Sequence, residues 1–547
     1  MRRPGKAEGS LEADIVIVGA GSAGCALAAR LSERADLSVL LIEAGGRDWN
    51  PWIHVPVGYF KTLDNPATDW CYVTEPDPGL NGRAIKWPRG RVLGGSSSIN
   101  GLLYVRGQAE DYDHWRQLGN PGWGFDDVLP AFIRSEAWED GASDTRGDGG
   151  PLSVSHGRLS RPIVDEWMAA AVASGYPANP DYNSGDQEGV APFQLTMRKG
   201  LRCSSARAYL APARRRHNLT VVTGAQTRRI VIEDGRATGV EIVHGKGALE
   251  RVETVRARKE VILSAGAIGS PHLLMLSGVG EGAALQSAGV DTRHALPGVG
   301  KNLQDHLQAR PVFRCASSTI NTESRSLLRR IGMAVEFAVN RTGPMTMAAS
   351  LGAAFLKTRL EVETPDIQFH IQPFSADSPT EGPHPFDAFT ASVCVLRPES
   401  AGEIRLKSSD PMAHPRIHPN YLATQTDCDA LVEGIRIARR IAKHDPLAGQ
   451  ITAEHAPGPD VPDADEALLD WARNTATTIY HPTGTCKMGP KEDPKAVVDS
   501  RLRVHGVGNL RVADASIMPR IVSGNTNAPA IMIGERAAEF VKEDSTA

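Results

Sequence analysis

The sequence predicts an α/β fold in which one domain is discontinuous and a second domain is inserted into it. Three observations support this prediction. The chain of 547 residues is too long for one small core. A β–α–β pattern with three glycines lies near its start, and a strand followed by a glycine-containing turn returns at residues 261–264. A single β–α–β unit cannot use both segments, so we expect a domain whose strands come from distant parts of the chain.

The N-terminal unit is the stretch ADIVIVGAGSAGCALAARLSERADLSVLLIEAGG. An apolar strand at residues 15–18 leads into Gly19, Gly21 and Gly24, a helix follows, and a second apolar strand ends at Glu43. The glycines allow a tight turn and close approach of a pyrophosphate, and the helix N-terminus offers free N–H groups to phosphate. Glu43 can hold ribose hydroxyls and disfavours a 2′-phosphate. The unit therefore predicts FAD or NAD rather than NADP.

Two later segments have patterns that suit a ligand site. WPRGRVLGGSSSINGLLYVRG, residues 87–107, is rich in glycine and serine, which fits either a plain loop or backbone wrapped around a planar or phosphorylated ligand. TPDIQFHIQPF alternates polar and apolar residues, which is the period of a strand. The polar face of this strand, which carries His370, is expected to meet water or to line a substrate cavity.

Residues 326–341, SLLRRIGMAVEFAVNR, predict an amphipathic helix. Its apolar stripe consists of Leu327, Leu328, Ile331, Val335 and Ala338, with arginines outside the stripe. Two interpretations stay open: a lid helix packed on the surface of the protein, or peripheral contact with a membrane.

Composition excludes several classes of function. The formal net charge of -4 gives no electrostatic footprint for nucleic acid. The 7 cysteines contain no CxxC pair, so neither a disulfide framework nor a zinc site is expected, and no metal is predicted. The segment MRRPGKAEGSLEAD lacks the apolar stretch of a secretory signal and is expected to be a disordered lead-in. No apolar stretch approaches the roughly 20 residues of a membrane span. A reducing, cytoplasmic location is therefore expected, with the membrane surface as the other possibility for the amphipathic helix.

The segment IYHPTGTCKMG, residues 479–489, places His481 between a tyrosine and a proline. Proline restricts the preceding residue to extended backbone, so the His481 side chain has few directions in which to point. Two interpretations are open from this segment alone. The ring is either a loop histidine satisfied by a carbonyl group or a titratable group held in place for catalysis.

Four motifs together resemble the glucose-methanol-choline (GMC) family of flavin oxidoreductases over nearly the whole chain. They are IVIVGAGSAGCALAARL with IEAG, GRVLGGSSSINGLLYVRG, GAIGSPHLLMLSGVG, and a tail of YHPTGTCKMG, LRVADASIMP and GNTNAPAIMIGERAAE. The resemblance implies FAD and an α/β fold, α+β overall. It consists of a discontinuous, Rossmann-like FAD-binding domain with an inserted substrate domain of antiparallel sheet and helices. The expected segments are 1–155, 206–310 and 471–547 for the FAD-binding domain, and 156–205 and 311–470 for the substrate domain.

The resemblance also assigns site residues. In the family, a histidine of the HP-GT motif and a His or Asn of the tail flank the flavin, and these positions match His481 and Asn525. A neutral histidine can take the hydroxyl proton of an alcohol, and an amide can donate a hydrogen bond to its oxygen. Ile99 stands where some members carry the histidine that links FAD covalently, so noncovalent FAD is expected. The cofactor positions implied are Gly19, Gly21, Ser22, Gly24, Glu43, Ala44, Arg91, Gly94, Gly95, Asn100, Gly101, Thr227, Asp514, Ala515, Asn527 and Pro529.

The motifs are most similar to those of bacterial alcohol dehydrogenases, with choline and polyethylene glycol dehydrogenases near by. They imply oxidation of a primary alcohol to an aldehyde, with electrons passed to a quinone or another non-oxygen acceptor. Choline is disfavoured because only 5% of residues are aromatic and no aromatic cluster stands out in the substrate segment. Three alternatives stay open: an oxidase that makes hydrogen peroxide from aryl or furanic alcohols, a non-redox cyanohydrin lyase, and a flavin-binding scaffold or membrane-associated carrier. The sequence does not indicate an oligomeric state.

Overall fold

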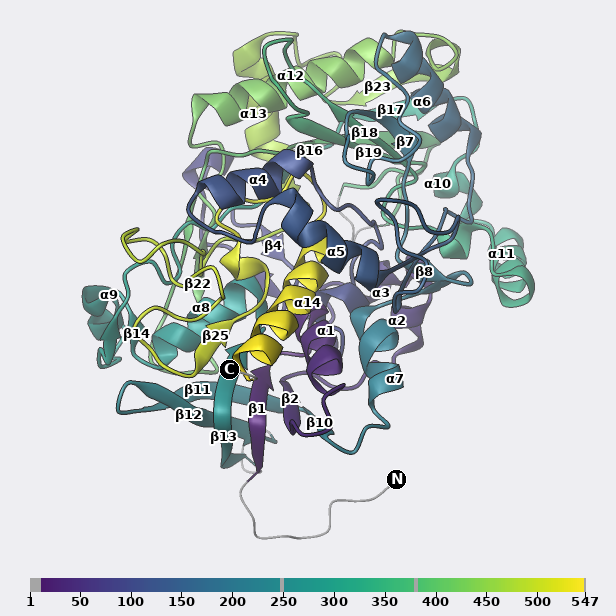
Figure 1. Ribbon diagram of the computed structural model, residues 1–547. Helices are drawn as coiled ribbons and strands as arrows, with labels where there is room; N and C mark the ends of the chain where they lie inside the picture. The colour runs from purple at the N-terminus through teal and green to yellow at the C-terminus, as the bar shows by residue number, and fades with distance from the viewer. Residues whose placement is uncertain (1–10, 246–249, 378–381, 546–547) are drawn as a thin grey trace.

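Two large β-sheets form the frame of the molecule, which is known from a computed structural model that describes residues 11–245, 250–377 and 382–545 (Figure 1). The first sheet has the strand order β10-β2-β1-β13-β12-β11, with β25 beside β13. Its strands are β1 (Glu12–Val18), β2 (Val39–Glu43), β10 (Leu219–Thr223), β11 (Ala225–Glu233), β12 (Arg236–His244), β13 (Arg251–Leu263) and β25 (Leu510–Val512). The segment predicted as a lead-in falls largely on residues 1–10, outside the described residues.

The first sheet is assembled from distant parts of the chain, which confirms the predicted fold class. β1 lies between β2 and β13, and all three run parallel, with Val16 opposite Val261. The helices α1 (Ser22–Leu31) and α14 (Asn527–Asp544) lie side by side against this sheet (Figure 1). A Cβ atom at Gly534 of α14 would lie 2.5 Å from the carbonyl oxygen of Ala23. The last helix of the chain therefore packs directly on the first.

The second sheet is antiparallel and has the order β23-β17-β20-β19-β18-β7, with β16 beside β20 and β24 beside β16. Helices α6 (Pro162–Ala173) and α12 (Gln425–Ile441) contact this sheet, and α13 (Asp465–Thr475) packs on α12. Its strands are β7 (Gly189–Pro192), β16 (Leu307–Ala309), β17 (Val312–Cys315), β18 (Gly352–Leu356), β19 (Ile367–Gln372), β20 (Ala388–Val395), β23 (Ile451–Ala456) and β24 (Thr477–Thr478).

Strands β16 and β24 join the second sheet although both were assigned from sequence to FAD-binding segments. They pair with each other, Leu307 opposite Thr478, and β16 also pairs with β20. These two short strands thus carry the chain from one sheet to the other. The domain boundaries at residues 155, 205, 310 and 470 stay predictions.

Strand β19 does not present a polar face to water. It lies between β18 and β20, and all of its residues except Gln372 are buried. His370 and Gln372 line an internal cavity instead. The water-facing interpretation is wrong because alternation of polar residues reports two different faces without saying what covers them.

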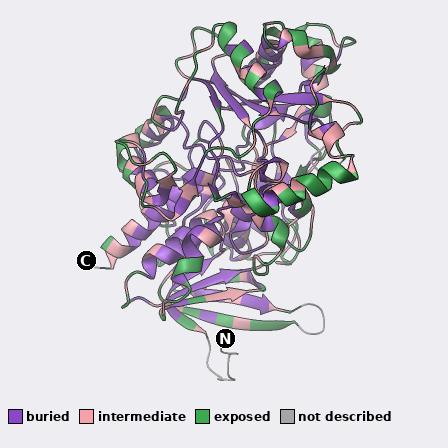
Figure 2. Ribbon diagram, turned by 90° about the vertical axis from the view of Figure 1, so that its right-hand side faces the viewer, coloured by how far each residue is buried: buried purple, intermediate pink, exposed green. Residues whose placement is uncertain are grey.

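Helix α11 (Leu327–Asn340) projects from the body of the protein (Figure 1) and is mostly exposed, its apolar residues included (Figure 2). Leu328 is 82% exposed and Val339 is 74% exposed, whereas only Phe337 is buried. The other exposed large hydrophobic residues of the helix are Leu327, Ile331 and Val335. The predicted stripe is therefore present, but it does not pack as a lid on the protein.

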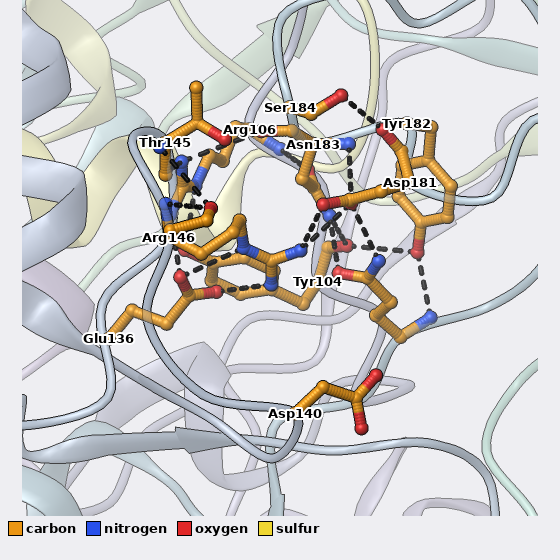
Figure 3. A network of polar contacts seen from close by, with 12 residues as sticks. Tyr104, Arg106, Glu136, Asp140, Thr145, Arg146, Asp181, Tyr182, Asn183 and Ser184 are labelled. Carbon is orange, nitrogen blue, oxygen red and sulfur yellow. Dashed lines mark hydrogen bonds and ion pairs between the residues drawn. The ribbon is translucent and has the colours of Figure 1, made fainter.

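A buried charge network ties three loop segments together (Figure 3). The Glu136 carboxylate lies 2.7 Å from Arg106 and 2.5 Å from Arg146, and Arg146 also lies 2.8 Å from Asp181. Arg106 and Glu136 are essentially inaccessible to solvent. Each of these buried charges has an opposite charge in contact, which is the arrangement that compensates for desolvation.

Among the described residues no helix is both long enough and apolar enough to cross a membrane.

Candidate active site

A cavity of about 330 Å³ lies between the two sheets. One end is lined by the β1–α1 turn and the end of β2, and the other by residues of β16, β19 and the segment after β24. Aromatic side chains gather in its walls, and they come from segments far apart in sequence: Tyr59, Phe60, Trp70, Tyr72, Phe374 and Tyr480. The absence of an aromatic cluster from the local sequence was therefore no guide to the cavity.

The β1–α1 turn forms a cradle that only glycine can form. Gly19 has φ +101, and a Cβ atom there would lie 2.4 Å from the carbonyl oxygen of Ser264. At Gly95 (φ +52) a Cβ atom would lie 2.7 Å from the Cα atom of Gly21, so two glycine-containing loops touch backbone to backbone. The first turn of α1 has no acidic residue and no side-chain cap. Its free N–H groups suit a phosphate.

Glu43 lies at the same end of the cavity. One carboxylate oxygen accepts from Ala20 N at 3.0 Å and the other from Gly45 N at 2.8 Å. Burial raises the pKa of Glu43 to about 7. Both oxygens keep further acceptor capacity, so the side chain can still bind hydroxyl groups of a ribose. The buried hydroxyl of Thr227 lines the cavity here and has no partner in the described part of the chain.

Most of the predicted cofactor residues converge on this cavity. Those that line it are Gly19, Gly21, Ser22, Glu43, Ala44, Gly95, Asn100, Gly101, Thr227, Asp514, Ala515 and Asn527. Gly24, Arg91, Gly94 and Pro529 do not line it. Gly24 instead allows close packing, since a Cβ atom there would lie 2.0 Å from the oxygen of Gly19. The Arg91 guanidinium lies over the Trp70 ring at 4.7 Å.

The backbone before His481 is held in an unusual conformation. Tyr480 has φ +71, which is rare for a residue with a side chain. The His481 N–H donates to Asp305 Oδ1 at 2.7 Å. The other carboxylate oxygen of Asp305 accepts from the hydroxyls of Tyr421 and Thr478. These contacts fix the backbone that carries the His481 ring.

Hydrogen bonds assign the proton positions on His481. The Leu396 carbonyl can only accept, so His306 Nε2, at 2.9 Å from it, carries a proton. A neutral His306 then accepts at Nδ1, and the donor is His481 Nδ1 at 3.0 Å. This leaves the lone pair of His481 on Nε2, which lies 3.1 Å from the Asn525 amide nitrogen. The nitrogen that faces Asn525 is therefore the basic one.

The His481 ring is neutral near pH 7. Burial lowers its pKa well below the usual range, and the neighbouring His306 and His370 lower it further. Burial likewise lowers the pKa of His306 to about 4 and that of His370 to about 3. The candidate base is thus ready to accept a proton without competition from a protonated neighbour.

Sequence reasoning did not assign a role to His306 or Asp305, which end the segment LPGVGKNLQDH, residues 296–306. An acid followed by a histidine after a glycine-rich turn was the available signal. Their contact with His481 depends on the pairing of β16 with β24, which no local pattern reveals. Among the described residues, no group of three or more His, Cys, Asp or Glu could hold a metal ion.

Comparison with known proteins identifies the family. Two family models described as GMC oxidoreductase match residues 13–308 and 398–534. The chain belongs to the GMC oxidoreductases. It is therefore an FAD-dependent enzyme that oxidises alcohols. The glycine cradle, Glu43 and the unpartnered Thr227 hydroxyl fit such a dinucleotide cofactor.

GMC relatives match nearly the whole chain. An oxygen-dependent choline dehydrogenase of Brucella suis is 42% identical over 97% of this chain and 96% of its own length. The mitochondrial choline dehydrogenase of Mus musculus is 41% identical over 98% of this chain and 90% of its own length. The crystal structure of pyridoxine 4-oxidase from Mesorbium loti has a TM-score of 0.86 and 33% identity, and the match covers 97% of this chain and 99% of that one.

Proposed function

We propose that this GMC oxidoreductase converts a primary alcohol to an aldehyde, with His481 as the base. The observation that carries the proposal is the neutral His481 ring with its basic Nε2 beside Asn525. An alcohol hydroxyl takes the place of the amide as the hydrogen-bond partner of Nε2 and gives up its proton there. The Asn525 amide then donates to the substrate oxygen as negative charge develops. Bound FAD supplies the hydride acceptor.

Gly19, Gly21, Ser22 and the first turn of α1 would hold the pyrophosphate of FAD, and Glu43 its ribose. Ile99 carries no group able to bond covalently to a flavin, and it packs with Ile53 and Val92. We therefore propose noncovalent FAD. Denaturation followed by filtration is expected to release all of the yellow colour. Flavin that stays with the polypeptide would contradict this assignment.

The proposed electron acceptor is a quinone or another carrier dissolved in or bound to a membrane. Its support is helix α11, whose outward face is apolar and is flanked by Arg325, Arg329, Arg330 and Arg341. These arginines have no ion-pair partner among the described residues, and such a face is complementary to anionic lipid headgroups. Ile320, shortly before α11, packs against the apolar cluster that contains Phe374, as does Phe60, and both phenylalanines line the cavity. Docking of α11 would therefore bring the cavity wall close to the bilayer.

Vesicle sedimentation tests this contact. The purified protein is expected to bind vesicles that contain phosphatidylglycerol more strongly than neutral vesicles. The double variant Leu328→Ser/Ile331→Ser should lose this binding without a change in Tm. Leu360→Ser is the matched control, because Leu360 is 98% exposed outside α11. Equal loss of vesicle binding in both variants, or a dimer that the double variant disrupts, would contradict the membrane assignment.

An oxidase is the second candidate. The names of two similar proteins favour it, since one relative is called oxygen-dependent and the pyridoxine enzyme is called an oxidase. The test is anaerobic reduction of the protein with a panel of aliphatic, aromatic and polyol alcohols, followed by admission of air. Slow return of the flavin colour that a quinone analogue accelerates supports a dehydrogenase. Fast return with hydrogen peroxide establishes an oxidase, and no bleaching by any alcohol would overturn the proposed function.

A further inference from the structure

The cavity contains a guanidinium that nothing in the described part of the chain neutralises. Arg310 directly follows β16 and lines the same cavity as His481. No hydrogen bond or ion pair joins its side chain to another described residue. Among the described carboxylates, Asp377 acts electrostatically on Arg310, and its side chain is 80% exposed and paired with His384 at 3.1 Å. Burial lowers the pKa of Arg310, yet arginine stays charged at neutral pH.

Two phenols share the same corner of the cavity. Tyr480 and Tyr59 both act electrostatically on Arg310, and both line the cavity. Neither hydroxyl has a hydrogen-bond partner among the described residues. A guanidinium and two free phenolic O–H groups are all donors, and a carboxylate is an acceptor with two oxygens. The corner is therefore complementary to a carboxylate.

The charge of the cavity points the same way. Its acidic residues are Glu43 and Asp514. Glu43 accepts from backbone N–H groups, and Asp514 accepts from Ser270, Gly266 and Ser516. Both belong to the proposed cofactor positions, and Glu43 lies at the end of the cavity formed by the β1–α1 turn, so neither is assigned to an ammonium group near Arg310. Tyr59, Phe60 and Phe374 would suit a cationic substrate as aromatic faces, but an adjacent unpaired arginine repels a cation.

Arg310 directly follows β16, and His306, which positions the base His481, directly precedes it. His306 and Arg310 are four positions apart on either side of β16, a separation of about 13 Å in extended chain. The hydroxyl that reacts at His481 and a carboxylate at Arg310 would therefore belong to opposite ends of one molecule. Apolar side chains such as Phe60 and Phe374 line the wall and suit the chain between them.

From these free donors in one cavity we infer that the substrate is an alcohol with a carboxylate at its far end, bound through Arg310, Tyr59 and Tyr480. The inference rests on the proposed alcohol oxidation. It separates this chain from relatives whose names specify choline, a cation. Arg310 is thus a specificity-determining residue that acts on the end of the substrate that does not react.

Matched substrates provide the test. The experiment compares ω-hydroxy carboxylates of increasing chain length with their methyl esters and with choline, and measures anaerobic flavin reduction. The hydroxy acid is expected to exceed its ester in kcat/KM by about tenfold to a hundredfold, the worth of one charge-assisted hydrogen-bonded contact. In Arg310→Gln this ratio should fall toward one, with the loss mainly in KM, and Arg310→Lys should restore part of it.

A binding measurement gives a readout that does not depend on turnover. Alkyl carboxylates without a hydroxyl group should raise the Tm of the holoenzyme and of Arg310→Lys, but not of Arg310→Gln. Equal use of acid and ester by the wild type, preference for choline, or an unchanged ratio in Arg310→Gln would overturn the inference. Failure of every alcohol to bleach the flavin would instead overturn the proposed function, so the two failures are distinguishable.

Discussion

Arginines lie in two regions of the molecule under opposite conditions. In the Glu136 network, Arg106 and Arg146 each contact a carboxylate (Figure 3). In the cavity, Arg310 has no such contact within the described residues, and the His370 Nδ1, Gln372 Oε1 and Thr227 Oγ1 atoms are also buried without a partner. Polar groups that a fold buries for its own stability are normally paired. Where such unpaired groups line a cavity, as Arg310 and these three side chains do, a bound molecule can complete their hydrogen bonds.

Breaking the network is expected to have the largest effect on stability. Glu136→Gln leaves the buried Arg106 guanidinium without a counter-charge and Arg146 with Asp181 alone, so the free energy of unfolding should fall by about 3–5 kcal/mol. Denaturant titration of the holoenzyme measures this change. Arg310→Gln removes a charge that has no ion-pair partner among the described residues, and should change the free energy of unfolding by less than about 1 kcal/mol. Equal destabilisation by both substitutions would abolish the distinction between the two regions.

His306 connects His481 to the backbone through its hydrogen bond to the Leu396 carbonyl. Its removal should have the next largest effect, in this case on kcat. His306→Phe takes away the acceptor for His481 Nδ1–H, so kcat is expected to fall about tenfold to a hundredfold. Because His306 acts through His481, the acid limb of the pH profile should shift as well. His306→Asn keeps one donor and one acceptor and is expected to recover part of the rate. An unchanged pH profile in His306→Phe would contradict a positioning role.

The pH dependence of kcat/KM reports the lowered pKa of His481 in the cavity. Its folded pKa is lowered well below the ordinary value of 6.5, so the ring stays in its basic form as pH falls through that value. A plot of kcat/KM should therefore be level between about pH 8 and pH 6.5, and should fall about tenfold per unit only well below 6.5. A midpoint near or above 6.5 assigned to His481 would show that the ring is not desolvated in the working enzyme.

The parts of the molecule that were predictable from sequence are those set by local periodicity. The strand before Gly19, the strand that ends at Glu43 and the helix at residues 327–340 appear where hydrophobic spacing places them. The glycine cradle was also predictable from the local sequence, because such a tight turn requires glycine at particular positions.

The remaining features depend on contacts between segments that are distant in sequence. His306 and His481 meet because β16 pairs with β24, and Arg310 reaches the cavity from the position directly after β16. The outward orientation of α11 likewise depends on what the rest of the chain leaves uncovered. Helical periodicity identified an apolar stripe on α11, but it could not distinguish a buried stripe from an exposed one.

Anaerobic stopped-flow mixing tests the central claim, that His481 is the base of alcohol oxidation, most directly. The wild type and His481→Gln would be loaded with FAD to equal occupancy and mixed with the same alcohol, and the loss of flavin colour followed. The account predicts that His481→Gln still binds FAD and has an unchanged Tm. Its bound FAD should be reduced by the alcohol about 10²- to 10⁴-fold more slowly than in the wild type. Reduction at the wild-type rate by the fully loaded variant would contradict the claim.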